Sequence, residues 1–507
     1  MKLASLFLAG AVGLAACSDE IPTGATPDGA NLSAASVSSD EAVTDRYIIL
    51  MKKNSVPADL AARIEAAGGK LVRTIPEVGI AIAAAPDPGF AGAIGADGRV
   101  MSVGPEPAMA LPEAVEFASD AMQPLAHPPV PVDPSLRPDP SIDDLYAAGL
   151  VWGVERVNAP ASWEHGAAFT GAGAKVGILD TGIASNHPDL SANIVFNACF
   201  SSRGDVIGRT WQAGDPCNPY PNASDHGTHV AGTVAAQFSG GRVVGVAPNA
   251  SLANYNVFEI IPGLGVRSFT SSRWRAMTHA ADNGVDVINM SLGSFTFIGN
   301  KLREEPVRQN GLATFLAAEK RVANYVMGRG TVIVSSAGNS GANLNGIYVA
   351  SPGQTQGHIT VGATGIRPEP RFQPGVSYDV RAFFSNYGAD VDVAAPGGDC
   401  GLANDCDRTL RPANWFEYLV LSSTVRPAVV CAETQSCAIS YGWKAGTSMA
   451  APHVAGVAAI VRAVNPGLSA IQVNSTIKRT AKDLGDRQQF GSGMPDAAAA
   501  GASAQSR

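Results

Sequence analysis

Three short apolar runs separated by helical segments constrain the fold of this chain more than any other feature. The runs are Lys175-Val-Gly-Ile-Leu-Asp180, Val285-Asp-Val-Ile-Asn-Met-Ser291 and Thr331-Val-Ile-Val-Ser335, and segments such as 271–283 between them have a helical pattern. Short apolar strands that alternate with helices are typical of a parallel sheet covered on both faces. The sequence therefore predicts an α/β fold, a three-layer domain built on a parallel sheet.

Polar residues stand where these predicted strands end. Asp180 and Ser291 close two of the runs, and Asn339 follows the third. In open α/β sheets the reactive residues gather beyond the carboxyl ends of the strands. We therefore expect these three side chains to lie near one site.

Ser448 stands just before a stretch that predicts a buried helix. Residues 449–464 are small and apolar nearly all round, as in a helix enclosed by protein. Proline is tolerated in the first turn of a helix, so Pro452 is expected there. Unpaired N–H groups at a helix N-terminus stabilise an alkoxide or an oxyanion. Ser448 is therefore a candidate nucleophile; the alternative is a simple N-cap.

His226 precedes a second small apolar helix and is the candidate base, because imidazole titrates near neutral pH. Asp180 would orient this ring and stabilise the imidazolium; the alternative for Asp180 is an Asx-type turn. His226 and His229 also have the spacing of a metal pair, but neither a third ligand nor the Glu of a His-Glu-x-x-His motif accompanies them. We expect His229 to be a packed helix residue.

Asn339 could supply the remaining group that acyl transfer needs. It lies in Ser335-Ser-Ala-Gly-Asn-Ser-Gly341, where its side-chain N–H groups can donate to an oxyanion; the alternative is a turn residue. Nucleophile, base, orienting carboxylate and oxyanion donor then all occur in one chain.

Three blocks of this sequence resemble the signatures of subtilisin-like serine peptidases. They are Asp180-Thr-Gly182, His226-Gly-Thr-His-Val-Ala-Gly232 and Gly446-Thr-Ser-Met-Ala-Ala-Pro-His-Val-Ala-Gly456, in that family's order. The resemblance runs from about Trp152 to Ala499. It implies a serine endopeptidase that cleaves polypeptides through an acyl-enzyme without a required cofactor, with Asp180, His226 and Ser448 as its catalytic triad.

The resemblance also implies where substrate binds. An extended peptide would lie along two main-chain segments, and position 350 corresponds to the floor of the primary pocket. The implied residues are Ser291, Leu292, Gly293, Ser336, Ala337, Gly338 and Ala350. Alanine where the family usually has glycine implies a pocket for medium or large apolar side chains. Residues 294–330 and 397–443 exceed the family's usual spacers and could narrow specificity.

Asp189 matches a calcium ligand of this family, so structural calcium is the metal that the resemblance implies. The companion loop, residues 237–243, has the usual length. Ser239, however, replaces a common Asn ligand, and Arg242 brings a positive charge. Oxygen ligands suit calcium, whereas a nearby cation opposes its binding.

The N-terminal part predicts a separate α+β module. Its predicted elements are strands at 47–51, 70–74 and 79–83 and a helix at 58–67 that Gly68-Gly69 ends. Residues 45–107 resemble the inhibitory propeptide of subtilisins, which assists folding and caps the active site. A Pro-rich linker, 108–145, would connect this module to the peptidase domain, 146–501. The resemblance implies self-cleavage between Glu106 and Leu111.

The first residues predict export. Lys2 and a short apolar stretch make residues 1–16 a signal peptide, since a membrane span needs about 20 residues. The sequence Leu14-Ala15-Ala16-Cys17 resembles a bacterial lipoprotein signal, in which Cys17 would carry lipid; an ordinary signal with a chance cysteine is the alternative. Residues 17–44 predict a flexible tether. We expect an exported protein whose precursor is lipid-anchored and whose mature form is secreted or periplasmic.

The other six cysteines predict disulfide bonds, because an even number in an exported chain favours them. Proximity in the sequence favours Cys199–Cys217, Cys400–Cys406 and Cys431–Cys437, although sequence alone leaves the connectivity open. Zinc is the competing interpretation, but no Cys-x-x-Cys pair occurs and no His lies among the last four cysteines.

Several other functional classes fit the sequence less well. A net charge of −8 without a long basic run argues against a nucleic-acid partner. A peptide-binding pseudo-peptidase would lack a member of the triad, and none is missing. An esterase of another fold would have the motif Gly-x-Ser-x-Gly and the order Ser, Asp, His along the chain. Here the serine lies in Gly446-Thr-Ser-Met-Ala450, and the order is Asp, His, Ser. A purely structural exported protein explains none of the three blocks.

Overall fold

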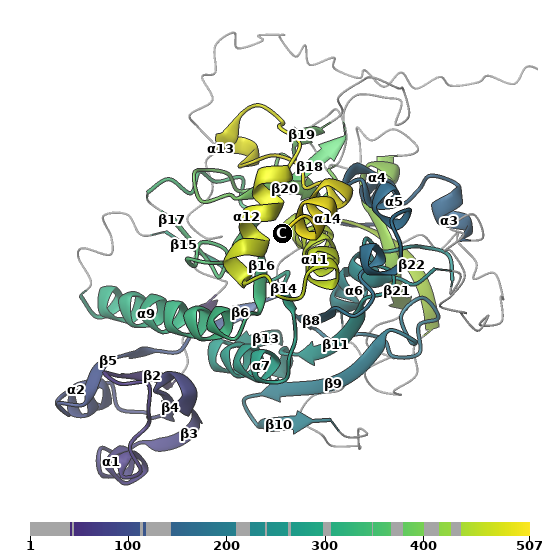
Figure 1. Ribbon diagram of the computed structural model, residues 1–507. Helices are drawn as coiled ribbons and strands as arrows, with labels where there is room; N and C mark the ends of the chain where they lie inside the picture. The colour runs from purple at the N-terminus through teal and green to yellow at the C-terminus, as the bar shows by residue number, and fades with distance from the viewer. Residues whose placement is uncertain are drawn as a thin grey trace, which may run out of the picture.

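The computed structural model describes residues 41–42, 45–111, 115–117, 143–208, 224–238, 241–261, 265–297, 306–346, 348–366, 379–399, 415–426 and 438–507. A small N-terminal module lies beside a larger body that is built on a nine-stranded sheet (Figure 1).

The N-terminal module is a four-stranded antiparallel sheet in the order β3-β4-β2-β5, with two helices on one face. Its elements are β2 (Arg46–Met51), α1 (Leu60–Ala66), β3 (Lys70–Ile75), η1 (Pro76–Val78), β4 (Ile80–Ala84), α2 (Phe90–Gly95) and β5 (Val100–Pro105). The strands and the helix expected here all form. Gly68 follows α1 with a φ of +80°, which favours glycine, and a Cβ at Gly69 would lie only 2.6 Å from the Phe90 ring.

The central sheet is parallel from β9 to β20, as the alternating pattern predicts, with antiparallel strands at two places. The order is β10-β9-β11-β8-β14-β16-β18-β19, and β20 also pairs with β18; β10 and β19 are antiparallel to their neighbours. The strands are β8 (Lys175–Asp180), β9 (Ile194–Ser201), β10 (Gly204–Ile207), β11 (Ser251–Asn256), β14 (Val287–Met290), β16 (Val332–Ser336), β18 (Ile359–Ile366), β19 (Asp379–Arg381) and β20 (Val393–Pro396).

Helices cover both faces of this sheet, and successive strand residues point alternately into two hydrophobic cores. Val287 and Val332 belong to one core, and their neighbours Ile288 and Ile333 to the other. Helices α6 (His226–Ala235), α11 (Thr447–Val464), α12 (Ala470–Thr480) and α14 (Ala497–Gln505) line the first core; α7 (Thr270–Asp282) and α9 (Pro306–Gly328) line the second. The predicted α/β three-layer fold is confirmed.

The remaining helices are short. They are α3 (Asp144–Ala147), α4 (Trp152–Arg156), α5 (Ala159–Trp163), η3 (Ala167–Thr170), η4 (Trp415–Tyr418) and α13 (Arg487–Phe490). Among the described residues, α11 is long and apolar enough to cross a membrane, but most of it is buried in the protein core, as the sequence predicts for this helix.

Three smaller sheets surround the central one. The first has the order β1-β6-β13-β12, the second pairs β15 with β17, and the third has the order β21-β22-β7. Their strands are β1 (Glu41–Ala42), β6 (Ala108–Ala110), β7 (Val115–Phe117), β12 (Glu259–Ile261), β13 (Gly265–Phe269), β15 (Ser294–Phe297), β17 (Tyr348–Ser351), β21 (Val420–Arg426) and β22 (Ala438–Ala445). Residues within both long spacers form structure, namely α9 and the β21–β22 hairpin.

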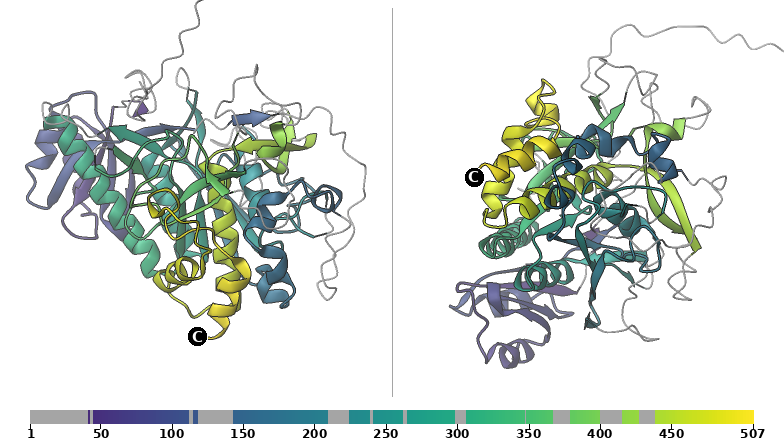
Figure 2. Two further views of the ribbon diagram at one scale, coloured as in Figure 1. Left: turned by 90° about the horizontal axis from the view of Figure 1, so that it is seen from above. Right: turned by 45° about the vertical axis from the view of Figure 1, so that its right-hand side comes forward.

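The N-terminal module packs the free face of its sheet against α7 and α9 (Figures 1 and 2). Ile48 and Ile80 join the same hydrophobic core as Phe315 of α9. Polar contacts surround this interface. They are Glu106 accepting from the Ser271 N–H at 2.7 Å, Arg46 pairing with Glu106 at 2.7 Å, Arg73 with Asp205 at 2.8 Å, and Arg321 donating to the Met51 carbonyl at 2.7 Å.

Candidate active site

Asp180 is the last residue of β8 and is fully buried. Its Oδ1 accepts a hydrogen bond from the Thr181 N–H at 2.7 Å. Both carboxylate oxygens also face His226, with Nδ1 lying 2.8 Å from Oδ1 and 3.0 Å from Oδ2. A buried carboxylate is costly unless it is paired, and this contact provides the partner.

His226 is the first residue of α6 and is buried beside Asp180. Because a carboxylate can only accept, the proton of the neutral ring lies on Nδ1 and the lone pair lies on Nε2. The buried Nε2 makes no hydrogen bond in this structure. The ring is therefore held by one nitrogen while the other can take a proton.

Ser448 is the second residue of α11 and exchanges two hydrogen bonds with Ser291. The Ser448 hydroxyl donates to the Ser291 carbonyl at 3.2 Å, and the Ser291 hydroxyl donates to the Ser448 carbonyl at 2.7 Å. In this structure the Ser448 hydroxyl thus points to Ser291 rather than to His226 Nε2. Contacts between nucleophile and base are often loose before substrate binds.

Pro452 lies in the second turn of α11, which begins at Thr447, and not in the first turn as expected. Proline has no N–H, so it cannot donate to the carbonyl four residues earlier, which belongs to Ser448. The Ser291 hydroxyl bonds that carbonyl instead. Ser291 therefore compensates for the proline and fixes the main chain of the candidate nucleophile.

Asn339 follows β16 and is oriented by the residue before Ser448. Its Oδ1 accepts from the Thr447 N–H at 2.8 Å and from the Thr447 hydroxyl at 2.7 Å. Because Thr447 holds the amide oxygen, the side-chain N–H groups of Asn339 point away from Thr447. A Cβ on Gly446 would come within 3.3 Å of Asn339 Nδ2. Glycine therefore leaves room beside the donor.

The predicted substrate-binding residues lie on two main-chain segments and on one further strand. Ser291, Leu292 and Gly293 follow β14, and Ala350 lies in β17, where its N–H donates to the Gln354 side chain at 2.6 Å. Ser336 ends β16, and Ala337 and Gly338 follow it. The Ala337 carbonyl accepts from Asn386 at 2.8 Å and the Gly338 carbonyl from the Asn386 N–H at 3.0 Å. The Ala337 and Gly338 carbonyls thus each already accept one hydrogen bond, as the Ser291 carbonyl does from the Ser448 hydroxyl.

Comparison with known proteins identifies the family. A model of the subtilase family of peptidases matches residues 171–493, more than half of the chain. Subtilisin BL of Lederbergia lenta is 33% identical over 354 residues, which is 70% of this chain and 99% of the relative. The chain belongs to the subtilase family. Subtilisin E of Bacillus subtilis (strain 168) is 32% identical over 373 residues, covering 72% of this subtilase and 77% of the relative.

Solved structures agree with this assignment. A protease of Pseudoalteromonas arctica PAMC 21717 is 32% identical, has a TM-score of 0.52, and covers 73% of this subtilase and 100% of its own chain. Fervidolysin of Fervidobacterium pennivorans shares the fold with a TM-score of 0.65 at 21% identity, over 92% of this chain and 62% of its own. Like its relatives, this subtilase is a serine endopeptidase.

His229 of this subtilase is a structural residue, as expected. The ring is buried, and Nε2 lies 3.0 Å from the Val420 carbonyl and 3.2 Å from the Gly442 carbonyl. Both partners are acceptors, so Nε2 carries the proton. Burial lowers the pKa of His229 well below its usual value. The ring therefore stays neutral and connects α6 to the β21–β22 hairpin.

Asp189, the predicted calcium ligand, is surrounded by hydrogen-bond donors. Its Oδ1 accepts from the Tyr441 hydroxyl and the Arg242 N–H, each at 3.2 Å, and Oδ2 accepts from the Ser423 hydroxyl at 3.3 Å. Burial raises the pKa of Asp189 to about 7. A calcium ligand must turn its oxygens toward the ion, and here they are turned toward donor hydrogens.

The nearby charges of Asp189 are mixed: the Asp143 carboxylate also raises its pKa, and Arg242 places a positive charge in the neighbouring loop. The Arg242 guanidinium forms two hydrogen bonds with Asp144 of α3, at 2.8 and 2.7 Å, and lies 5.6 Å from the centre of the Tyr441 ring. No group of three or more His, Cys, Asp or Glu residues that could hold a metal occurs in the described part of the chain. Ser239 lies outside the described residues. The donor set around Asp189 does not fit Ca²⁺, and we derive no role for that ion.

Lys444, which sequence reasoning did not single out, lies next to this site. It lies on β22, four positions before Ser448, is almost fully buried, and its Nζ lies 3.0 Å from Asp225 Oδ1. Asp225 directly precedes His226. The signal in the sequence is a lysine within the strand-like run Ile439-Ser-Tyr-Gly-Trp-Lys-Ala445, which leads to Ser448.

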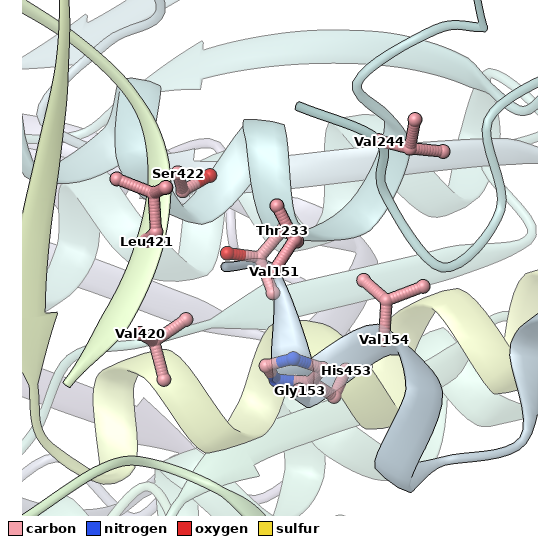
Figure 3. Close-up of a pocket in the computed structure, with 9 residues that line it drawn as sticks. All are labelled: Val151, Gly153, Val154, Thr233, Val244, Val420, Leu421, Ser422 and His453. Atoms are coloured by element: carbon pink, nitrogen blue, oxygen red, sulfur yellow. The ribbon is translucent and has the colours of Figure 1, made fainter. Parts of the chain in front are cut away.

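A small cavity lies between α4, α6, β21 and α11, with the ring of His453 on one side (Figure 3). Its volume is about 10 Å³, which is at most the space of one water molecule. His453 Nδ1 lies 2.8 Å from the Met449 carbonyl, and burial lowers the pKa of this ring to about 4. The cavity is too small for a substrate and belongs to the packing behind the site.

The predicted cysteine chemistry lies mostly outside the described residues. Cys199 is buried in β9 and is disulfide-bonded. Its predicted partner Cys217 and the other predicted pairs, Cys400–Cys406 and Cys431–Cys437, lie outside the described residues, as does Cys17. The connectivity therefore stays a prediction.

Proposed function

We propose that this subtilase cleaves peptide bonds through an acyl-enzyme on Ser448, with His226 as base and Asp180 as the orienting carboxylate. The observation that carries this proposal is the contact of His226 Nδ1 with both oxygens of Asp180, which leaves the Nε2 lone pair available. His226 Nε2 accepts the Ser448 hydroxyl proton while Oγ bonds to the substrate carbonyl carbon. The same proton passes to the leaving amine as the C–N bond breaks, and water then repeats the sequence on the ester.

Asn339 is the proposed oxyanion donor of this reaction. Thr447 holds the amide by its oxygen, at 2.8 and 2.7 Å, so the N–H end needs no reorganisation as charge develops on the substrate oxygen. Donors that are oriented before reaction stabilise the transition state more than the bound substrate. Substrate is proposed to lie along Ser291–Gly293, with Ala350 in the floor of a pocket for an apolar side chain.

The N-terminal module, residues 45–107, is proposed to be an inhibitory propeptide. Its sheet shares a hydrophobic core with α7 and α9, and the buried Arg46–Glu106 pair contacts the start of α7 through the Ser271 N–H. These contacts support a module that folds onto the catalytic body.

The chain beyond this module supports self-cleavage at a bond slightly later than the sequence suggests. β6 pairs antiparallel with β13, so that Ala110 opposes Arg267, and β7 pairs antiparallel with β22, so that Val115 opposes Ala445, three residues before Ser448. If this part of the chain runs first along β13 and then along β22, the bond nearest Ser448 lies between Ala110 and Val115. We therefore propose a cut in that interval rather than across the whole of Glu106 to Leu111.

Export, lipid attachment and release complete the proposal. Residues 1–16, which resemble a signal peptide, support export of this chain. If Cys17 carries lipid, cleavage near residue 111 separates the enzyme from its lipid. The precursor is then held at the membrane and the mature enzyme is soluble, with the three predicted disulfide pairs formed outside the cytoplasm.

The experiment is to express wild type and Ser448→Ala and to fractionate the cells. Ser448→Ala removes one buried hydroxyl and should fold, yet it should remain uncut at full length with the membranes. Wild-type enzyme should appear in the soluble fraction with a new N-terminus between residues 111 and 115. A Ser448→Ala protein that matures normally would contradict the serine mechanism. A wild-type catalytic domain that still begins at Cys17 would contradict the release step alone.

A further inference from the structure

Helix α3, the first helix of the larger body, is attached to the rest of that body at one arginine. The N–H groups of Leu145 and Tyr146 both donate to the Arg242 carbonyl, at 3.1 and 3.2 Å. The Arg242 guanidinium donates two hydrogen bonds to the Asp144 carboxylate, at 2.8 and 2.7 Å. Two-bond contacts of this kind are strong and geometrically specific. Arg242 therefore holds α3 through its main chain and its side chain together.

The buried Asp189 fixes Arg242 in turn. The Arg242 N–H donates to Asp189 Oδ1 at 3.2 Å. A Cβ on the preceding Gly241 would lie 1.2 Å from the same oxygen, so glycine allows the main chain to lie against the carboxylate. Tyr441 of β22 also donates to Asp189, at 3.2 Å, and the guanidinium lies 5.6 Å from the centre of its ring. Arg242 thus joins three segments that are far apart in the sequence, namely α3, the chain after β8, and β22.

Three carboxylates lie around this junction. Asp189 and Asp143 are fully buried, and the charge of Asp143 raises the pKa of Asp189, so the two interact. The side chain of Asp144, the partner of the guanidinium, is 39% exposed. Carboxylates that interact in this way disfavour one another's charge, whereas a nearby cation favours it. The Arg242 guanidinium supplies that cation from within the chain.

We propose that Arg242 is a built-in cation that fastens α3 to the loop after α6 and to β22, in the place where the resemblance implies a bound calcium ion. A calcium site fills and empties with the concentration of the ion, whereas an arginine is part of the chain and stays charged. The attachment of α3 therefore does not depend on calcium. It depends on ionic strength, because salt screens a partly exposed ion pair. The proposal concerns how the body is held together and does not rest on the proposed catalytic function.

The packing of α3 makes its release measurable. Leu145 is buried in the hydrophobic core, and the ring of Tyr146 lies 6.0 Å from that of Trp163, which in turn contacts the ring of Phe238. Opening of α3 breaks these contacts together with the two main-chain hydrogen bonds to Arg242. The amide hydrogens of Leu145 and Tyr146 can then exchange with solvent, so their exchange rate reports how firmly α3 is attached.

The test is hydrogen–deuterium exchange of residues 143–150, measured by mass spectrometry on the full chain in a Ser448→Ala background, which prevents self-digestion. Arg242→Gln should raise the exchange rate about threefold to tenfold, as expected for a partly buried two-bond ion pair. Asp144→Asn should raise it by a similar factor, and the double variant should add little, because the same contact is lost. Arg242→Lys should fall between wild type and Arg242→Gln, since it keeps the charge but not the two-bond contact.

Salt and calcium separate an arginine from a metal ion. Sodium chloride at about 1 M should raise the exchange rate of the wild-type segment toward that of Arg242→Gln and should change the variant little. EDTA and added calcium chloride should leave the exchange rate unchanged. Arg329→Gln is the matched control, because it removes an exposed arginine that pairs with Asp282 at 3.2 Å, and it should leave the exchange of residues 143–150 as in wild type.

Faster exchange in EDTA, or slower exchange with added calcium, would show that an ion holds α3 and would overturn the proposal. Equal exchange rates in wild type, Arg242→Gln and Asp144→Asn would overturn it as well. Asp144→Asn changes a partly exposed side chain, so the test remains decisive if the Arg242 variants do not fold.

Discussion

Two aspartates on the same stretch of chain, Asp180 and Asp189, are both completely buried, yet their surroundings differ. Asp180 faces the ring nitrogen of His226, a group that can gain a positive charge. Asp189 instead accepts hydrogen bonds from the hydroxyls of Tyr441 and Ser423, which cannot gain a positive charge. Burial is thus the same for both aspartates. Their partners decide whether the carboxylate can stabilise a positive charge that forms during catalysis.

The comparison shows that family position alone does not assign a role. Both aspartates occupy positions that resemble functional positions of subtilases, one in the triad and one as a calcium ligand. Only Asp180 retains a partner suited to that role. At Asp189, side chains of β21 and β22 donate hydrogen bonds to the carboxylate oxygens. Arg242 of the neighbouring loop forms hydrogen bonds with Asp144. In this chain a hydrogen-bond network stands where the resemblance implies an ion.

The largest expected effect comes from making the same substitution at both aspartates. Asp180→Asn should lower kcat/KM by about four orders of magnitude, because the amide no longer stabilises the imidazolium or fixes its tautomer. Asp189→Asn should retain activity within a few-fold, since Asp189 contacts no residue of the triad. Steady-state hydrolysis of one peptide by both purified variants makes the measurement. Comparable losses in the two variants would end the distinction.

A smaller loss is expected at the oxyanion donor. Asn339→Ala should lower kcat by about a hundredfold to a thousandfold with little change in KM, as is known for such donors in this family. Thr447→Val provides a comparison, because it removes the hydroxyl that orients Asn339 but leaves the amide, and its loss should be smaller. A change in KM alone for Asn339→Ala would assign this residue to binding rather than to transition-state stabilisation.

The smallest effect concerns stability. Burial raises the pKa of Asp189 to about 7 from its ordinary value of 3.8, so the folded state binds a proton that the unfolded state has released. This contribution to stability is complete below pH 3.8 and is lost as the pH rises through 7. We compare the free energy of unfolding of the protein with that of Asp189→Asn. The difference, protein minus variant, should fall as the pH rises from about 4 to about 7.

This difference is measured by urea unfolding in a Ser448→Ala background, which prevents self-digestion, with and without EDTA. The chelator should leave both unfolding midpoints unchanged. A difference that rises with pH, together with a loss of stability in EDTA, would restore Asp189 as a calcium ligand.

The sequence predicts the sheet well, and the contact between Asp180 and His226 forms between two of its motifs, because these features depend on local patterns. The run 175–180 is β8, and the small apolar stretch after Ser448 is most of α11. The surroundings of Asp189 could not be predicted, since Ser423 and Tyr441 are more than 230 residues away in sequence and meet it only after the β21–β22 hairpin folds. Pro452 was placed in the wrong turn because the hydrogen bond from Ser291 that compensates for it is also long-range.

The central claim is that Ser448 is the nucleophile that Asp180 and His226 activate. Treating the mature enzyme with phenylmethylsulfonyl fluoride and mapping the modified peptide by mass spectrometry tests it most directly. We predict one sulfonyl group per molecule, on Ser448, formed in proportion to the loss of activity and formed much more slowly in Asp180→Asn. Modification at another residue as activity disappears, or full activity with Ser448 modified, would contradict the account.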